Sequence, residues 1–584
     1  MSYSAKIKSY LLLFFYVSFF LQCIVKSDAK NQSILRYKWV NNPIYFFKTT
    51  FIDSTSVQNA LFLETMGEKK GVIGSLFPVY KKNATHPVIG TRIKYKTENC
   101  GNLSLIITSI GKCEKINFID TIQLRTTKDW KESIQITSTK ETYLLNISIE
   151  AKSLNLNDAK IWISDFEIFI NGEEVIDNLK QIDKKENINL QKKDLISWKK
   201  ISYNNLTFLG HKILALGETV HGTKTMNDIA IAIFKERILK HHCKFILLEI
   251  PLEYSFYINR FVKNDENFKL EDISTYFDSY LYSDSLVSFM QWLKEYNLTS
   301  NEKISVWGFD VNPVQLKSRI DLFNFFYNLN MYKNSKELDI ICKLLIDTKV
   351  SFEKIIYMFD ENPYLASVLK EEELKLMFHC LKVTPQYSST YYRFVNRNNV
   401  MNEIISFIID NFLKKNETAT LFGHFGHLNY LNVQDLSVMN SFSLGYYMKN
   451  KYKDDYSFIA LTTYQGSAML VKSNSEFEIS VLSPAPEGSL EYILTTLNAD
   501  SIYLSMSKID CSDVLKLRFV GNKNLADQFR FIIPKSRMDG LLFIKESKII
   551  DKRKTVLNKN LNTDFIIMNS YKEALEKIRN TNKF

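Results

Sequence analysis

Two regions of the chain differ in the period at which hydrophobic and polar residues repeat. Between about residue 54 and residue 178, short runs alternate apolar and polar positions and are separated by polar turns. Alternation with a period of two is typical of half-buried β-strands. The runs that suit strands are 103–109, 120–125, 133–137, 143–149 and 160–170. Several short strands at this spacing predict an all-β sandwich module.

After about residue 200, short apolar runs alternate with segments of helical spacing. Buried strands are predicted over 212–217, 244–249, 303–310 and 419–424, with later strands over 456–462 and 541–544. Helices are predicted over 223–242, 286–296 and 397–413, and residues 313–395 are expected to form a mostly helical insertion or cap. This order predicts an α/β class, with a parallel sheet covered by helices on both faces and preceded by the all-β sandwich module.

The start of the chain has the layout of a secretory signal peptide. Lys6 and Lys8 precede an apolar stretch over 10–25, and Ser27 or Ala29 offers a cleavage site. The stretch is short for a membrane-spanning helix, although an uncleaved anchor is the alternative. We therefore expect export to the periplasm, the cell surface or the medium, with no membrane contact after cleavage. The predicted organisation is a signal peptide over 1–27, the β-sandwich module over 28–182, a linker over 183–200, a catalytic domain over 201–547 and a helical tail over 548–584.

Composition and charge exclude several classes of protein. Apolar residues make up 45% and charged residues 24% of the chain, which excludes a mainly disordered protein. The net charge of +11 is spread along the chain, which favours a solvated lysine-rich surface. No zinc-finger or RNA-recognition signature is present, so we expect no nucleic-acid partner.

The seven cysteines do not form a metal-binding or redox motif. No CxxC occurs, which argues against a zinc ribbon and a thioredoxin-like site. Cys100 and Cys113 lie close together in the β-rich region and could be paired in an exported chain. Buried thiols are expected at Cys243, Cys342, Cys380 and Cys511.

Reactive side chains gather at the ends of the four predicted strands after residue 200, where open parallel sheets bind ligands. They are Glu218 and His221 after the first strand, Glu249 at the second, Asp310 at the third, and His424 and His427 at the fourth. The three acids also have structural interpretations, which are interaction with a helix start for Glu218, a backbone hydrogen bond for Glu249 and a loop cap for Asp310. No G-x-S-x-G, H-E-x-x-H or Walker motif is present. Without an evident nucleophilic serine or cysteine, the chemistry would need histidine and carboxylate. A histidine base that a glutamate orients can activate water, and a second histidine can donate to the developing oxyanion or leaving group.

The same residues resemble the motifs of the erythromycin esterase family, in order and over roughly residues 200–545. The matching segments are Gly217-Glu218-Thr219-Val220-His221-Gly222, Leu248-Glu249, Tyr296-Asn297, Gly308-Phe309-Asp310, Arg397 with Met401-Asn402, and His424 with His427. The resemblance implies an α/β fold with a helical cap, and hydrolysis of an ester or lactone by direct attack of water. It implies no covalent intermediate, no cofactor and no metal, and it implies a role in the response to antibiotics.

The resemblance also assigns roles to individual residues. It makes His221 the general base, Glu249 and Glu218 its carboxylate partners, and His424 and His427 groups that assist the oxyanion or leaving group. Substrate contacts are assigned to Asp310 and Arg397. Two positions depart from the family pattern: Ala230 stands where members often have Arg, and Phe425 stands where the fourth loop usually has Asn.

Three functions are compatible with the sequence. The first is an exported hydrolase of a small-molecule ester or lactone that uses His221 and water. The second is a metal-dependent hydrolase in which the Glu218, His221, Glu249 and His424/His427 side chains hold a divalent ion. The third is a surface protein without catalysis that binds a glycan through its β-module, which resembles the jelly-roll modules found beside secreted hydrolases. In the preferred interpretation of that module, Trp130 and Trp162 are core aromatics of a spacer.

Overall fold

The computed structural model describes most of the chain after residue 36. The described residues are 37, 39–41, 47–52, 60–65, 70–154, 157–176, 190–197, 206–274, 284–312, 314–387, 393–431, 442–471, 477–498, 500–521, 528–549 and 563–581. The predicted signal peptide over 1–27 and all of the predicted linker except 190–197 lie outside them. Within the described part, no helix is long and apolar enough to span a membrane.

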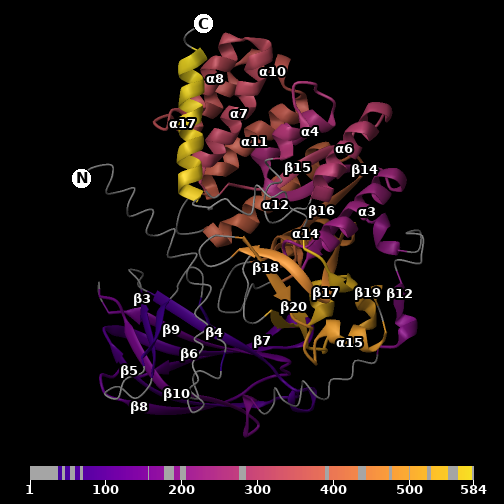
Figure 1. The fold of residues 1–584 in the computed structure, drawn as a ribbon. Coiled ribbons are helices and arrows are strands. Elements are labelled where there is room, and N and C mark those ends of the chain that lie inside the picture. Colours follow the sequence, from indigo (N-terminus) through magenta and orange to yellow (C-terminus); the bar gives the residue numbers. More distant parts are fainter. Residues whose placement is uncertain are drawn as a thin grey trace.

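The N-terminal module is a sandwich of two antiparallel sheets, as the alternating pattern predicts (Figure 1). One sheet has the strand order β1 (Val40–Asn41), β4 (Lys70–Pro78), β9 (Leu144–Ser153), β6 (Cys100–Ile110) and β7 (Ile116–Leu124). The other has the order β2 (Phe47–Ile52), β3 (Ala60–Thr65), β10 (Lys160–Ile170), β5 (Val88–Glu98) and β8 (Lys131–Ser138), with β11 (Glu173–Glu174) paired to β10. Their inner faces form one apolar core.

The interpretation of Trp130 and Trp162 as core aromatics is wrong, because both side chains are half-buried at the outer face of the second sheet. Trp162 lies between Ile161 and Ile163 on β10, and both isoleucines are fully buried in the sandwich core. Successive side chains of a strand point to opposite faces, so the residue between two inward isoleucines points outward.

The second domain is built on a nine-stranded mixed sheet. Its order is β12 (Leu195–Ser197), β19 (Ser501–Ser505), β22 (Gly540–Ser547), β17 (Tyr456–Val471), β13 (Ile213–Glu218), β16 (Thr418–His424), β14 (Cys243–Pro251) and β15 (Ser305–Asp310), with β18 (Phe477–Leu482) paired to β17. The pairings from β22 to β15 are parallel, which confirms the predicted sheet. The antiparallel strands β12, β18 and β19 were not predicted.

Helices cover this sheet and form the predicted insertion after β15 (Figure 1). Those between the first strands are α3 (Lys224–Lys240), α4 (Leu252–Val262), α5 (Leu270–Ser274) and α6 (Asp284–Thr299). The insertion contains α7 (Gln315–Lys333), α8 (Lys336–Ile346), α9 (Phe352–Asp360), α10 (Pro363–Val368) and α11 (Glu371–Tyr387), followed by α12 (Arg393–Phe412). Later helices are α13 (Phe425–Leu428), α14 (Leu444–Tyr452), α15 (Leu490–Thr496), α16 (Pro534–Arg537) and α17 (Thr563–Thr581).

Helix α17 packs on the helical insertion near the chain's end (Figure 1). The Tyr571 hydroxyl donates a hydrogen bond to the carbonyl oxygen of Ile346, at 3.3 Å, and Ala574 is buried against the same core. The C-terminal segment therefore contributes to the packing of α7 and α8.

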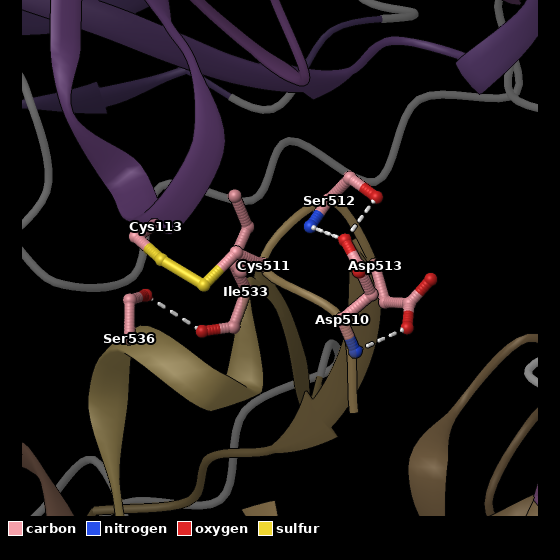
Figure 2. Close-up of a disulfide and its surroundings, with 7 residues drawn as sticks. All are labelled: Cys113, Asp510, Cys511, Ser512, Asp513, Ile533 and Ser536. Carbon is pink, nitrogen blue, oxygen red and sulfur yellow. Dashed lines mark hydrogen bonds between the residues drawn. A yellow bond between two sulfur atoms is a disulfide. The ribbon is translucent and has the colours of Figure 1, made fainter. Parts of the chain in front are cut away.

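The structure pairs Cys113 with Cys511 and not with Cys100 (Figure 2). Cys100 begins strand β6 and Cys113 lies beyond its other end, so an extended strand of roughly 30 Å separates them. The Cys100 thiol is buried and donates to the carbonyl oxygen of Asn102, at 3.1 Å. The expectation that Cys511 is a thiol was also wrong, whereas the other three predicted thiols are buried and unpaired. The disulfide joins the two domains across 398 residues of sequence.

Candidate active site

The predicted site residues meet at the carboxyl ends of four adjacent strands. The strand order β13-β16-β14-β15 places Glu218, His424, Glu249 and Asp310 side by side, because each lies at or near the end of its strand. His221 follows β13, His427 lies on α13, and Arg397 reaches the group from α12. The structure therefore brings together every residue that the sequence proposed for the site.

His221 and Glu218 form a buried pair. Nδ1 of His221 lies 2.7 Å from Oε1 of Glu218, and the exposed fractions of the two side chains are 10% and 3%. The turn between them and α3 needs Gly222, which has φ of 72° and whose added Cβ would lie 2.0 Å from the carbonyl oxygen of Met469. The backbone N–H of His221 donates to the carbonyl oxygen of Val520, at 3.3 Å. The imidazole is thus fixed by its carboxylate and by its own backbone.

Burial controls the ionisation of this pair. It raises the pKa of Glu218 well above its ordinary value, and the nearby Glu249 carboxylate adds to the rise. Burial lowers the pKa of His221 to about 4, while the charge of Glu249 raises it and that of Arg397 lowers it. His221 is therefore neutral at pH 7 and can accept a proton.

Glu249 is the centre of a network of charged groups. Its Oε1 accepts from Nη2 of Arg397 at 3.2 Å, and its Oε2 accepts from the backbone N–H of His424 at 2.6 Å. Arg397 also donates from Nε and Nη2 to the two oxygens of Asp310, at 3.0 and 2.6 Å. Gly423 makes room for the carboxylate, since an added Cβ would lie 2.7 Å from Oε2 of Glu249. With 27% of its side chain exposed, Arg397 is more accessible than Glu249, at 5%.

Both ring nitrogens of His424 are hydrogen-bonded to backbone groups. Nδ1 accepts from the N–H of Gly426 at 3.2 Å, so Nε2 carries the proton and donates to the carbonyl oxygen of Val520 at 3.3 Å. The ring lies against that of His221, with centroids 4.4 Å apart, and Phe519 packs edge-on to its other side. Burial lowers the pKa of His424 well below its ordinary value, with further lowering by His221 and His427. His424 therefore supports His221 by packing.

His427 connects Arg397 to a residue that the sequence reasoning missed, Asn398. Nδ1 of His427 lies 2.7 Å from Oδ1 of Asn398, whose amide nitrogen donates to the carbonyl oxygen of Phe442. Nδ1 is therefore the donor, and Nε2 accepts from Nη1 of Arg397 at 3.4 Å. Burial, followed by the charge of Arg397, lowers the pKa of His427 to about 3. This neutral ring holds the guanidinium in place.

Other missed residues lie beneath the two histidine loops. The Thr219 hydroxyl donates to that of Thr462 at 3.1 Å, which donates to Oε1 of Glu491 at 2.6 Å. The same Glu491 oxygen accepts the backbone N–H of Arg518, two residues before Val520. Thr462 ends a predicted strand, but no pattern near Glu491 or Val520 in the sequence points to the site.

The two departures from the family pattern are both apolar in the structure. Ala230 is fully buried on α3. Phe425 is the first residue of α13 and packs against Phe458 and Phe519, with ring centroids 5.7 and 6.1 Å apart. The amide that the family places in this loop is thus replaced here by a contact within an aromatic cluster.

The acidic and histidine side chains hydrogen-bond to one another and to the backbone and do not converge on one point. In the part of the chain that the structure describes, no group of three or more His, Cys, Asp or Glu side chains is placed to hold a metal ion.

Comparison with known proteins supports the resemblance in the sequence. The model of the erythromycin esterase family matches residues 371–547. No curated protein matches the chain. Among solved structures, a Bacillus cereus protein is 15% identical, with a TM-score of 0.49, and the match covers 64% of this chain and 99% of that one. A succinoglycan biosynthesis protein is 14% identical, with a TM-score of 0.48 and coverage of 63% and 97%.

A mutant of the erythromycin esterase EreC in its open conformation is 16% identical, with a TM-score of 0.42, and the match covers 60% of this chain and 96% of that one. The residues matched by the family model include Arg397, His424 and His427. The family model therefore confirms the predicted resemblance over residues 371–547.

Proposed function

We propose that this protein hydrolyses a small-molecule ester or lactone with water that His221 activates. The observation that carries the proposal is the buried His221–Glu218 pair, with 2.7 Å between Nδ1 and Oε1, beside the Glu249–Arg397–Asp310 network. The match to the erythromycin esterase family supports an esterase-like hydrolase.

In the first step, water attacks the carbonyl carbon of the substrate. Nε2 of His221 takes the proton from water, and the carbonyl π electrons move to oxygen to give a tetrahedral oxyanion. In this step Nδ1–H of His221 donates to Oε1 of Glu218, which leaves Nε2 unprotonated and directed to the reaction, as carboxylates orient histidine bases elsewhere. Arg397 stabilises the oxyanion, because it is a cation with 27% of its side chain exposed and Asp310 and His427 fix its orientation.

In the second step, the tetrahedral intermediate collapses. The C–O bond of the ester breaks, and the leaving alkoxide takes the proton from His221, which returns to its neutral form. The products are a carboxylic acid and an alcohol, which remain one hydroxy acid when the substrate is a lactone, and no covalent bond to the protein forms. His424 supports the base by packing against its ring, at 4.4 Å between centroids.

The test is hydrolysis by the purified protein of a panel of aryl esters, lactones and macrolides, with and without a chelator. Turnover that is unchanged in the chelator supports activation of water by His221. Turnover that the chelator abolishes and a divalent ion restores would replace it with the metal-dependent alternative. A folded protein that turns over none of the panel would contradict ester and lactone hydrolysis.

The pH dependence of kcat/KM tests the state of His221. Its pKa of about 4 means that the base stays unprotonated until the pH falls towards 4, so kcat/KM is expected to be lost only there. Because the charge of Arg397 lowers this pKa, Arg397→Gln is expected to move the loss to higher pH, whereas Arg397→Lys retains the charge and the position. Stopped assays between pH 3.5 and 8, about one value every half unit, measure it. A loss centred at the ordinary histidine pKa in the unmodified protein would contradict a buried base.

Glycan binding by the β-module is a second proposal, favoured by a row of aromatic side chains on its outer face. Phe62 and Trp162 lie with ring centroids 5.1 Å apart, and Nζ of Lys96 lies 4.9 Å from the ring of Trp162 and 5.3 Å from that of Trp130. All four side chains are half-buried, so they present apolar faces and a cation at the surface. Such a row suits stacking against sugar rings and hydrogen bonds to hydroxyl groups.

Trp162→Ala is expected to weaken binding to a soluble polysaccharide at least about fivefold, the equivalent of about 1 kcal/mol for one aromatic contact. Affinity electrophoresis across several polysaccharides measures it. Phe169→Ala, on the same face of β10, is the matched control and should bind as the unmodified protein does. Equal affinities of the Trp162→Ala and unmodified proteins would place any glycan elsewhere.

Export through the segment 1–27 remains part of this proposal. The apolar stretch over 10–25 supports it, and so does the Cys113–Cys511 disulfide, because disulfides persist in oxidising compartments.

A further inference from the structure

The tip of the hairpin between β6 and β7 joins the β-module to the second domain. This second domain, which contains the mixed sheet, is named the esterase domain after the family that it resembles. This tip, η3 (Lys112–Glu114), carries Cys113, which is bonded to Cys511 and whose N–H donates to the carbonyl oxygen of Cys511 at 3.0 Å (Figure 2). Cys113 and Glu114 both have left-handed backbone conformations, with φ of 51° and 56°. Two successive non-glycine residues keep such a conformation only where their surroundings hold them. The tip is therefore shaped by the domain that it contacts.

On the side of the esterase domain, this contact lies at the hairpin of β20 (Leu515–Arg518) and β21 (Phe529–Ile532). Val514 and Ile533, just outside this hairpin, are buried in the core of the β-module. An ion pair between Lys81 and Asp513 crosses the same contact. The two domains thus share apolar core, charge and a covalent bond here.

Glu114 uses both of its carboxylate oxygens on residues of the esterase domain. Oε1 accepts the backbone N–H of Ile533 at 3.0 Å, and Oε2 accepts from Nε of Arg537 on α16. The exposed fractions of the Arg537 and Glu114 side chains are 12% and 10%. Because both side chains are nearly buried, the charge-assisted bond from Arg537 to Glu114 holds the Arg537 guanidinium in one orientation.

Arg537 in turn holds the residues that follow His427. Its carbonyl oxygen accepts the N–H of Tyr430 at 3.0 Å, and its Nη1 lies 3.4 Å from Oδ1 of Asn429. The Asn429 amide nitrogen donates to the carbonyl oxygens of Phe425 and Gly426, at 2.8 and 3.1 Å. These carbonyls belong to α13, the single helical turn that carries His427 and that His424 caps at its start.

We propose that Glu114 of the β-module is a positioning residue of the active site. It acts through Arg537 and Asn429 on helix α13, and so sets where His427 meets Arg397. This inference rests on the proposed hydrolase function for its effect on turnover, and on geometry alone for its effect on α13. A short helix of one turn has few internal hydrogen bonds, so contacts at its end decide its orientation. The β-module is then part of the catalytic scaffold.

Glu114→Gln is the test, in the full-length protein. The amide keeps the size of the side chain and an acceptor for Ile533, but it loses the charge that holds Arg537. Glu114→Asp keeps the charge and tolerates the left-handed backbone. It should therefore resemble the unmodified protein more than Glu114→Gln does. Lys81→Met is the matched control, because it removes the other ion pair of this contact, which has no connection to α13 among the described residues.

The first readout is the NMR spectrum of histidine-labelled protein, with signals assigned by single His→Gln variants. Glu114→Gln is expected to shift the ring signals of His427 and His424 and to leave exposed His242 unchanged. Arg537→Lys, which is too short to bridge Glu114 and Asn429, should give the same shift. Unchanged His427 signals in folded Glu114→Gln protein would overturn the proposal, whatever the turnover.

The second readout is kinetic. Glu114→Gln is expected to lower kcat about tenfold at nearly constant KM, whereas Lys81→Met leaves kcat within about twofold. Equal losses in the two variants would show that the contact only stabilises the fold, and would overturn the proposal. If the unmodified protein turns over no ester while the His427 signals still shift, the positioning role stands and the hydrolase proposal fails.

Discussion

Replacing His221 by alanine is expected to lower kcat about 10³-fold, within the range measured for loss of a general base. In the proposed mechanism, Nε2 of His221 takes the proton from the attacking water, and no other neutral histidine of the site can replace it. The ring nitrogens of His424 are both hydrogen-bonded to backbone groups, and those of His427 contact Asn398 and Arg397. Steady-state kinetics on the best ester of the panel measures the loss.

Two controls separate this loss of chemistry from a loss of folding. His242→Ala removes a histidine whose side chain is 67% exposed, and it should leave kcat unchanged. Circular dichroism and the thermal midpoint should show that His221→Ala is folded. Added imidazole is expected to restore part of the activity, because the deleted ring leaves space beside Glu218. Full activity in His221→Ala would show that another group activates the water.

The strand ends were predictable because local sequence decides them. Each strand that carries a site residue is a short, continuously apolar run, since parallel strands are buried on both faces. The polar residue that ends such a run must lie at the carboxyl edge of the sheet, and Glu218, Glu249 and Asp310 all do. The rule of ligand binding beyond these ends then predicted that they meet.

The connections between the strand ends were not predictable, because they depend on contacts far apart in sequence. Glu249 and Arg397 are 148 residues apart. The carbonyl oxygen of Val520 accepts from both histidine loops, yet a backbone group has no signature in the sequence. Glu114 and Arg537 are 423 residues apart and belong to different domains. Their roles follow from the tertiary contact between the domains, which no local period encodes.

The disulfide and the outer tryptophan were missed for different reasons. Proximity in sequence favoured Cys100 as the partner of Cys113, but the strand between them holds them apart. Trp162 did carry a usable signal, because Ile161 and Ile163 flank it and alternation then requires it to point outward.

Replacing Glu249 by glutamine is expected to lower kcat by about 10²-fold, comparable to loss of one preorganised electrostatic partner. The amide oxygen would stay on the N–H of His424, which lies 2.6 Å from Oε2 in the carboxylate. The amide nitrogen would then face Nη2 of Arg397, and two donors cannot pair. Arg397 would keep its bonds to Asp310 and lose its bond to the side chain at position 249.

The same change should move the pH dependence in a defined direction. The charge of Glu249 raises the pKa of His221, so its removal lowers that pKa further below about 4. A base with a lower pKa accepts a proton less readily at neutral pH, which adds to the loss of kcat. The loss of kcat/KM on acidification is therefore expected at lower pH in Glu249→Gln, opposite to the shift for Arg397→Gln.

Glu253→Gln is the matched control for this variant. Glu253 is also buried, four residues along the chain, and burial raises its pKa to about 7, so glutamine resembles its protonated form. Its carboxylate accepts from the hydroxyl of Ser318, which is no part of the site. Glu253→Gln should therefore keep kcat, and a comparable loss in the two variants would mean that any buried change near β14 damages the fold. The decisive result is a loss of kcat in folded Glu249→Gln alone, together with a loss of kcat/KM on acidification that moves to lower pH. It would show that this carboxylate sets both the orientation of Arg397 and the basicity of His221.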